Sequence, residues 1–466
     1  MGLRVHCVVL AIALASIVVV AQPSATRAGE ARPVGWRRDT SGSFPDALPP
    51  TEWSDKQHVS WKAKLPGGSN SSPVIVGDKV LVTSEPDRLT CLAADDGGKL
   101  WEVQNGFDRV LTAAQFAVAK QDHETAHGIR KRIDAVHKQI EELERRRKDA
   151  PEDAELKAER KALDKQVESA RAELPPLEKY AIPQKSAGCS TATPLCDGKF
   201  VYVLYGTGIA ACYDLDGNPQ WIKLFDKPET DWGHTASPLL VGDLLIVHFT
   251  DMVALDHRTG QVRWKTEIKP NYGSPISVGL DGGDVIVTAG GDVVRAVDGR
   301  LLTKKIAEPL SRCSPVVRDR TVYFMQSKAE AVELPQSISE NLETKSLWKT
   351  NLTSENYFAS PLWHDGLIYT VSENRVLTVL DATNGEEVYL ERLRFKTRAP
   401  VVSSLSATGD YVFITNEQGS TKVLRAGRSY AEVAENALEH LRSSLAFDGH
   451  RLFVRKSSNL YCIAKE

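Results

Sequence analysis

Short runs of alternating apolar and polar residues fill most of this chain, and turn residues separate them. Residues 72–76 begin with Ser-Pro and continue as a β-branched run, Gly77-Asp78 marks a tight turn, and residues 79–83 alternate polar and apolar side chains. A third apolar run follows, and then a run that contains Trp101. Because alternation with a period of two is typical of half-buried strands, residues 72–101 predict a unit of four strands.

The same unit recurs along the chain. Its starts are Ser72, Thr193, Ser237, Ser274, Ser314, Ser360, Ser403 and Ser443. Six of the seven intervals between these starts lie between 37 and 46 residues, and the first interval is 121 residues. Removing a helical stretch, residues 107–180, shortens the first interval to 47 residues. A period near 40 to 45 residues is typical of one four-stranded propeller blade. We therefore predict an all-β fold, an eight-bladed β-propeller, which favours binding surfaces over a buried catalytic pocket.

The two ends of the chain predict how the ring closes. The last unit ends with residues 460–464 and lacks a Trp-containing outer strand, whereas a spare copy of that strand surrounds Trp61 before the first unit. Pairing of this N-terminal strand with the last blade would remove open sheet edges. We expect domains as follows: residues 29–57 as an N-terminal extension, 58–106 and 181–466 as the propeller, and 107–180 as a helical hairpin.

The insertion has the spacing of a coiled-coil seam. Its apolar residues are Ile129, Ile133, Val136, Ile140 and Leu143 in one run, and Leu156, Leu163, Val167, Ala170 and Leu174 in the other. This spacing predicts an antiparallel helical hairpin that projects from the ring, with Asp149 as a candidate cap of the second helix. The hairpin is either a partner contact or a tolerated insertion without a role.

One short motif on this insertion suggests metal chemistry. His123-Glu124-Thr125-Ala126-His127 matches the H-E-x-x-H pattern, in which two His side chains bind zinc and the Glu acts as general base. The flanking residues are polar, and no third ligand is marked out. We interpret His123 and His127 as exposed residues of a polar helix and expect no metal site, with a zinc hydrolase as a weaker alternative.

The N-terminus predicts export. Arg4 precedes an uncharged run of 14 residues, 8–21, and small residues continue to Ala28. This is the profile of a cleaved signal peptide, residues 1–28, and the run is short for a membrane span. We expect a periplasmic or extracellular protein without a membrane span after cleavage. The chain has 58 basic and 61 acidic residues, a net charge of −3 that does not favour nucleic acid binding.

Six cysteines remain after cleavage, an even number that raises the question of disulfides. They are Cys91, Cys189, Cys196, Cys212, Cys313 and Cys462. Cys91, Cys212 and Cys462 occupy the third-strand position that Ala254 fills in another unit, where a small apolar side chain is needed. Equivalent positions in different blades are too far apart for a bridge. Cys189 and Cys196 are the one candidate pair, and the sequence leaves their bridge open.

The repeats resemble those of the pyrroloquinoline quinone (PQQ)-like β-propeller superfamily. The matching pieces are Ser-Pro-x-x-x-Gly-Asp, Ala-Leu-Asp and Thr-Gly-x-x-x-Trp, which are clearest from Ser237 to Trp264. The resemblance implies that Trp residues at the blade ends dock against neighbouring blades. The matching positions are Trp61, Trp101, Trp221, Trp264 and Trp348. Gly299 to Lys304 and Tyr389 depart from this pattern, so we expect weaker junctions there.

The superfamily contains quinoprotein dehydrogenases, with PQQ and calcium, and non-catalytic propellers that act as scaffolds. The enzymes have an adjacent Cys-Cys disulfide and a Glu/Asn/Asp calcium set, whereas this chain has no adjacent Cys pair. We therefore expect a monomeric, non-catalytic scaffold that binds a protein or peptide partner and has no catalytic residues and no cofactor. A PQQ-dependent dehydrogenase is the alternative.

Candidate partner-binding residues stand just before the Ser-Pro starts. They are Asn70, His234, Tyr272, Arg312, Phe358 and Arg442. Since these residues enter the innermost strands, we expect them to ring one face of the channel, and unlike the repeated residues behind them they differ from blade to blade. They either contact a partner or only fill the mouth of the channel.

Overall fold

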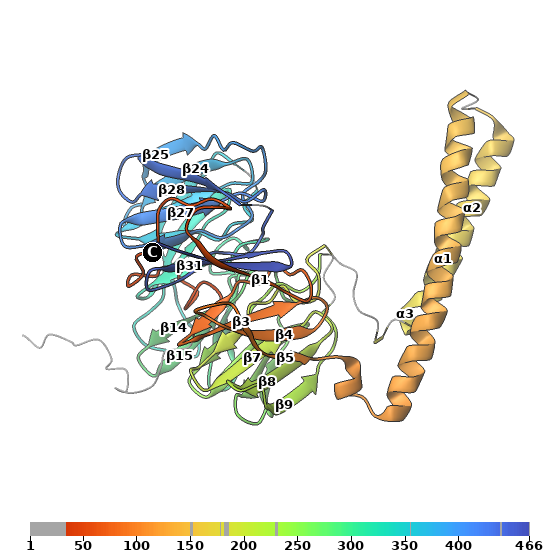
Figure 1. The fold of residues 1–466 in the computed structure, drawn as a ribbon, viewed down its shortest axis with the longest axis horizontal. Coiled ribbons are helices and arrows are strands. Elements are labelled where there is room, and N and C mark those ends of the chain that lie inside the picture. Colours follow the sequence, from red (N-terminus) through yellow and green to blue (C-terminus); the bar gives the residue numbers. More distant parts are fainter. Residues whose placement is uncertain are drawn as a thin grey trace, which may run out of the picture.

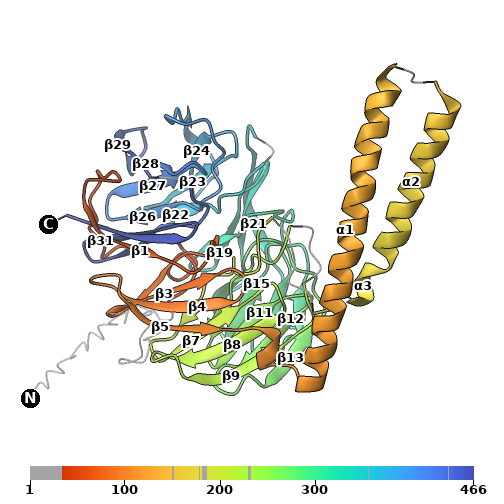
Figure 2. The same ribbon diagram turned by 45° about the vertical axis from the view of Figure 1, so that its right-hand side comes forward.

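The computed structural model describes residues 34–149, 152–177, 179–180, 186–228, 232–354, 356–438 and 440–465. Eight four-stranded antiparallel sheets form a ring, and a helical hairpin projects from one side of it (Figures 1 and 2). The predicted eight-bladed propeller with its inserted hairpin is thereby confirmed. The predicted signal peptide lies outside the described residues.

Each blade runs from an inner to an outer strand, and the inner strands of neighbouring blades contact one another around the channel. Blades 1 to 4 consist of β2 (Val74–Val76), β3 (Lys79–Ser84), β4 (Arg88–Ala93) and β5 (Lys99–Gln104); β6 (Leu195–Cys196), β7 (Phe200–Leu204), β8 (Ile209–Asp214) and β9 (Pro219–Leu224); β10 (Leu239–Val241), β11 (Leu244–His248), β12 (Met252–Asp256) and β13 (Val262–Thr266); and β14 (Ile276–Leu280), β15 (Gly283–Val287), β16 (Val293–Arg295) and β17 (Leu301–Thr303).

Blades 5 to 7 follow the same plan. They consist of β18 (Val316–Arg318), β19 (Thr321–Phe324), β20 (Lys328–Glu333) and β21 (Lys345–Asn351); β22 (Leu362–His364), β23 (Leu367–Val371), β24 (Val376–Asp381) and β25 (Glu387–Arg392); and β26 (Ser406–Thr408), β27 (Tyr411–Thr415), β28 (Ser420–Arg425) and β29 (Glu432–Ala437).

Blade 8 is built from both ends of the chain. It contains β30 (Ala446–Asp448), β31 (Arg451–Lys456) and β32 (Asn459–Ala464), and its outer strand is β1 (Val59–Lys64). The register of β1 on β32 pairs Trp61 with Cys462. The N-terminal strand therefore completes the last blade, as the sequence pattern indicates.

The hydrophobic core lies between neighbouring blades. Middle strands such as β11 are buried on both faces, whereas in the outer strand β13 only Trp264 is buried. One cluster joins Tyr202 and Leu204 of blade 2 to Leu245 and Val247 of blade 3. Because each sheet packs on two neighbours, the central strands carry near-continuous apolar runs, whereas the outer strands are largely exposed.

Five outer strands each carry a Trp that contacts the next blade. The indole Nε1 donates to a carbonyl oxygen of that blade in the pairs Trp61–Ala94, Trp101–Leu215, Trp221–His257, Trp264–Ala296 and Trp348–Ala382, at 2.8 to 3.0 Å. Each ring also lies over a turn glycine of the next blade. At Gly260 φ is +66°, and a Cβ atom there would lie 2.6 Å from the ring of Trp221, so the position requires glycine.

All six described cysteines are free thiols with buried side chains. Cys212 pairs with Trp221 across β8 and β9, so its small side chain lies beside the large indole. Burial raises the pKa of the Cys189 and Cys196 thiols to about 12. The structure therefore contains no bridge between Cys189 and Cys196, the pair that the sequence left open.

The hairpin is formed by α1 (Ala113–Asp149) and α2 (Ala154–Ala172), with short turns η1 (Phe107–Arg109) and α3 (Leu174–Leu177) at its base. Ile129, Ile133 and Val167 form its buried seam. The cap of α2 is Asp153, whose Oδ1 accepts from the backbone N–H of Glu155 and Leu156 at 2.8 and 3.1 Å. The prediction of Asp149 as cap was wrong, because α1 continues through that residue.

Among the described helices, none is both long enough and apolar enough to span a membrane.

Candidate functional site at the mouth of the central channel

A ring of Ser and Thr hydroxyl groups lines the channel where the inner strands begin. We call it the hydroxyl belt: Ser72, Thr193, Ser237, Ser274, Ser314, Ser360, Ser404 and Ser444. Seven of these hydroxyl oxygens each accept a hydrogen bond from the backbone N–H of the belt residue in the preceding blade, at 2.8 to 3.1 Å. With the N–H donor given first, the pairs are Ser72–Thr193, Thr193–Ser237, Ser237–Ser274, Ser274–Ser314, Ser314–Ser360, Ser360–Ser404 and Ser444–Ser72. The belt therefore joins adjacent blades at the inner wall.

The belt corrects the register of two repeats. The sequence placed their starts at Ser403 and Ser443, but the belt uses Ser404 and Ser444. Both repeats have two consecutive serines and no proline after them, so the sequence did not decide between the two. In the structure, the hydroxyl of Ser443 instead donates to the carbonyl oxygen of Arg455 at 2.7 Å.

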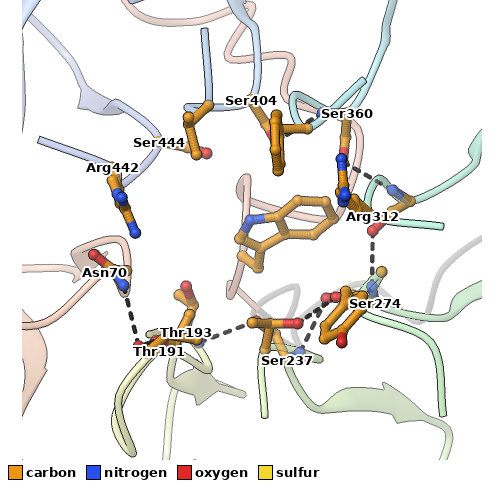
Figure 3. Close-up of a pocket in the computed structure, with 18 of the residues that line it drawn as sticks. Asn70, Thr191, Thr193, Ser237, Ser274, Arg312, Ser360, Ser404, Arg442 and Ser444 are labelled. Carbon is orange, nitrogen blue, oxygen red and sulfur yellow. Dashed lines mark hydrogen bonds between the residues drawn. The ribbon is translucent and has the colours of Figure 1, made fainter. Parts of the chain in front are cut away.

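The side chains two residues before the belt line a single cavity. We call them the rim residues: Asn70, Thr191, Thr235, Tyr272, Arg312, Phe358, Val402 and Arg442. The cavity has a volume of about 270 Å³, and the belt residues line its deeper wall. Figure 3 shows Asn70, Arg312 and Arg442 together with belt residues around one central space. Each blade thus contributes one rim side chain.

Five of the six residues predicted from the sequence are rim residues, and His234 is not. His234 is 3% exposed and packs 4.9 Å from the ring of Phe249. Burial lowers the pKa of its imidazole to about 3. The prediction for His234 was wrong because this residue stands three positions before the belt, and neighbouring side chains of an extended chain point to opposite sides. Thr235 takes the rim position.

Sequence reasoning also missed Thr191 and Val402. A constant offset of two residues from the belt would have found both of them. That signal was hidden by the weak Ser-Pro pattern in blades 2 and 7. In blade 2, Thr193 replaces the Ser of the repeat, and in blade 7 no Pro follows Ser404.

A strap of residues 34–44 crosses the channel below the cavity. Val34 forms a bridge with Cys196 of blade 2, and Ser43 forms one with Ala407 of blade 7. Both partners stand three residues after a belt residue, whereas the rim stands two residues before it. The strap therefore lies on the strand side of the belt, with Trp36 lining the cavity. The interblade loops, which precede the rim residues in the chain, lie on the opposite side of the belt.

Arg37 anchors the strap in the wall of the channel. Its side chain is 1% exposed, and Nη2 donates to the carbonyl oxygens of Pro361 and Leu405, each at 2.8 Å. Burial lowers the pKa of its guanidinium to about 9. Since Pro361 and Leu405 each follow a belt residue, Arg37 connects the strap to blades 6 and 7.

Two arginines line the cavity, and they differ in whether their guanidinium groups are hydrogen-bonded within the described part of the chain. Arg442 is paired with Glu417, with 2.5 Å between Nε and Oε1. Arg312 has its guanidinium carbon 4.6 Å from the ring centroid of Phe358 and 5.6 Å from that of Trp232. Within the described part of the chain, Arg312 has no hydrogen bond and no ion pair. Its N–H donors are therefore available to a ligand.

The lining does not match a calcium-PQQ centre. Glu417 is the one carboxylate among the described lining residues, and Arg442 holds it. No group of three His, Cys, Asp or Glu side chains that could hold a metal ion is found in the described ranges. The cavity is also smaller than the roughly 300 to 1,000 Å³ of typical small-molecule sites. The donors present thus favour anions and peptide groups over a hard cation.

The H-E-x-x-H motif lies on α1, far along the chain from the rim. His123 and His127 are exposed, while Ala126 and Ile129 of the same segment are buried. The structure brings no third ligand to this pair among the residues it describes.

Comparisons with known proteins find similar propeller proteins. The PQQ-repeat family model described as outer membrane protein assembly factor BamB matches residues 52–130 and 160–303. These two segments, slightly less than half of the chain, are therefore similar to PQQ-like β-propeller repeats. No curated protein sequence matches this PQQ-like propeller.

Two solved structures have the same fold. The crystal structure of BamB from Moraxella catarrhalis has a TM-score of 0.54 and 10% sequence identity, and the match covers 87% of this chain and 98% of that chain. The computationally designed Ika8 protein has a TM-score of 0.52 and 8% identity, with 88% of this chain and 100% of that chain covered. At such identities these likenesses establish the propeller fold alone.

Proposed function

We propose that this PQQ-like propeller is an exported, monomeric, non-catalytic scaffold that binds a protein or peptide partner through its rim. The observation that carries the proposal is the contrast between belt and rim. The belt repeats Ser or Thr in every blade, whereas the rim two residues away contains six residue types around one cavity. Regular frames that present varied side chains at loops are typical of binding surfaces.

The composition of the rim supports a partner of peptide character. Arg312, Tyr272 and Phe358 are of the types enriched at protein interfaces. Trp232 beside them is 47% exposed, which is unusual for so large an apolar side chain. A cavity of about 270 Å³ has room for a side chain or a chain end, while the surrounding loops can support the rest of a partner.

Affinity capture from envelope extracts tests this proposal. A Tyr272→Ala/Phe358→Ala double variant should lose a partner that the wild-type protein retains. The matched control is Leu100→Ala/Val262→Ala, on the outer strands β5 and β13, where these side chains are 49% and 56% exposed. A partner retained by both double variants would refute binding at the rim.

Export is supported by the apolar run at residues 8–21 and by the match to an envelope-assembly family model. Peptide sequencing of the protein isolated from the cell envelope should give a new N-terminus just after residue 21, 25 or 28. Full-length protein recovered from the cytoplasm alone would contradict export.

The dehydrogenase alternative has a direct test. Protein reconstituted with PQQ and calcium should show no dye-linked oxidation of alcohols or sugars. Metal analysis of the purified protein should likewise find no stoichiometric zinc, which is the test of the H-E-x-x-H motif. Activity or zinc in either experiment would replace the scaffold proposal.

A further inference from the structure

Arg312 is the charged group in the cavity whose hydrogen-bonding capacity is unused. We propose that it binds a carboxylate, carried by an acidic side chain or the C-terminus of an extended peptide that enters from the loop side. This inference deepens the proposed function and rests on it. It assigns to the rim a class of ligand that neither the fold nor the family match specifies.

The aromatic neighbours of Arg312 orient it for this role. Phe358 and Trp232 lie 4.6 and 5.6 Å from the guanidinium carbon, distances at which rings contact the face of a guanidinium. These ring contacts use none of the guanidinium N–H groups in a hydrogen bond, and the fork of these groups matches the two oxygens of a carboxylate. The stacking also reduces the side-chain entropy that a ligand would otherwise have to remove.

The belt supplies further donors in the same cavity. Ser274, Ser314 and Ser360 are each no more than 5% exposed, and their oxygens accept backbone N–H groups. A hydroxyl that accepts in this way still has one O–H to donate. Within the described ranges, none of these three hydroxyl groups donates to a protein acceptor. Arg312 and the belt therefore present donors from two sides, a combination that suits a ligand with several acceptor oxygens.

The remaining charges in the cavity do not compete for this ligand. Glu417 is engaged by Arg442, so it neither pairs with Arg312 nor stands as a free negative charge. The whole chain has a net charge of −3, which gives no general attraction for anions. Recognition of an acidic peptide must then depend on the local site. One guanidinium matches the single charge of a carboxylate better than the double charge of a phosphate monoester.

A peptide selection tests the inference on the full mature chain. Displayed random 12-residue peptides are selected against the wild-type protein, and affinities of the synthetic winners are measured by calorimetry. The selected peptides should share an Asp, a Glu or a free C-terminus at one position. Replacing that carboxylate by its amide should weaken binding at least tenfold, and so should Arg312→Gln, with Arg312→Lys in between.

Arg318→Gln is the matched control. Arg318 belongs to the same blade and lies 4.6 Å from the ring of Trp363, but it does not line the cavity. Its loss should change affinity less than twofold. Peptides that bind the rim with equal affinity after amidation, or that prefer a phosphate group, would overturn the carboxylate inference and leave the scaffold function standing. Failure of wild-type protein to capture any partner would instead refute the proposed function.

Discussion

Single residues at the blade ends decide how strongly neighbouring blades are held. Trp264 donates to the carbonyl oxygen of Ala296 at 2.8 Å and is 9% exposed. Tyr389 occupies the equivalent position in blade 6, but its buried hydroxyl finds no partner among the described residues. A buried polar group without a hydrogen bond destabilises the folded state. Removing the polar group should therefore change the free energy of unfolding differently at the two junctions.

We predict that Trp264→Phe lowers the free energy of unfolding by about 1 to 3 kcal/mol, through the lost hydrogen bond and the smaller ring. Tyr389→Phe should leave stability unchanged or raise it by up to about 1 kcal/mol, because it removes the unpaired hydroxyl. Denaturant unfolding of both variants beside wild type checks this. A large loss in Tyr389→Phe would mean that the hydroxyl is bonded after all.

His234 predicts a dependence of stability on pH. Burial lowers its pKa from 6.5 to about 3, and the buried His248 is lowered in the same direction. Between pH 6.5 and 3 the unfolded chain binds protons that the folded chain does not, so stability falls as the pH falls. His234 alone contributes up to about 1.4 kcal/mol per pH unit in that window. Unfolding measured from pH 7 to pH 4 should show a smaller slope in His234→Phe, while His123→Asn, on the exposed face of α1, should keep the wild-type slope.

The sequence identified most of the rim but not all of it. Tyr272, Arg312 and Phe358 stand two residues before an unmistakable Ser-Pro, so their positions followed directly. His234 stands three residues before its Ser-Pro, one position further away than Tyr272, Arg312 and Phe358 stand from theirs, and Thr235 takes the rim position. Only the alternation of the backbone, fixed by the belt hydrogen bonds, shows which of the two points into the cavity.

At the level of elements, the hairpin and the strap have different relations to the ring. The hairpin has its own seam, and none of the described residues of its helices belongs to an interblade cluster. At its base, the rings of Phe107 and Tyr180 lie 5.7 Å apart. The strap, in contrast, inserts Arg37 into the wall of the channel. The hairpin should therefore be dispensable for folding.

Replacing residues 113–177 with a short Gly/Ser linker should leave the propeller folded and change its melting temperature by less than about 3 °C. The reason is that this change retains η1 and every residue of the interblade cores. Circular dichroism should show helix loss with the β signal preserved. Loss of cooperative unfolding in the shortened protein would show that the hairpin is part of the core.

The elements themselves were readily predicted, because period-two runs and heptad spacing are local signals. The seam residues Ile129, Ile133 and Val167 are buried as expected. The cap of α2 was not predicted correctly, since Asp149 and Asp153 both precede apolar heptads and only the length of α1 decides between them. The strap had no periodic signal, and its bridges to Cys196 and Ala407 depend on contacts far apart in sequence.

At the level of the whole molecule, the ring depends on the pairing of β1 with β32. That pairing covers an edge strand whose backbone groups would otherwise be open to other chains. The eight-blade ring was predictable from the repeat period and the missing last strand. The path of the strap across the channel was not, because it depends on contacts between residues far apart in sequence.

Deleting residues 1–65 should abolish the stable monomer, since it removes both the strap and β1. Deleting residues 1–33 should leave the melting temperature and the elution volume on size exclusion unchanged. Both measurements on the two truncated proteins test closure. A fully stable monomer without residues 1–65 would contradict it.

The central claim is that the rim is where a partner binds, and site-specific photo-crosslinking in cells tests it most directly. A benzophenone amino acid is placed at Thr191, Tyr272 or Phe358 on the rim, and at Leu100 or Val262 on the outer strands for comparison. We predict that the three rim positions yield one common cross-linked protein and that the outer positions do not yield it. Cross-links to that protein from the outer strands, with none from the rim, would contradict the account.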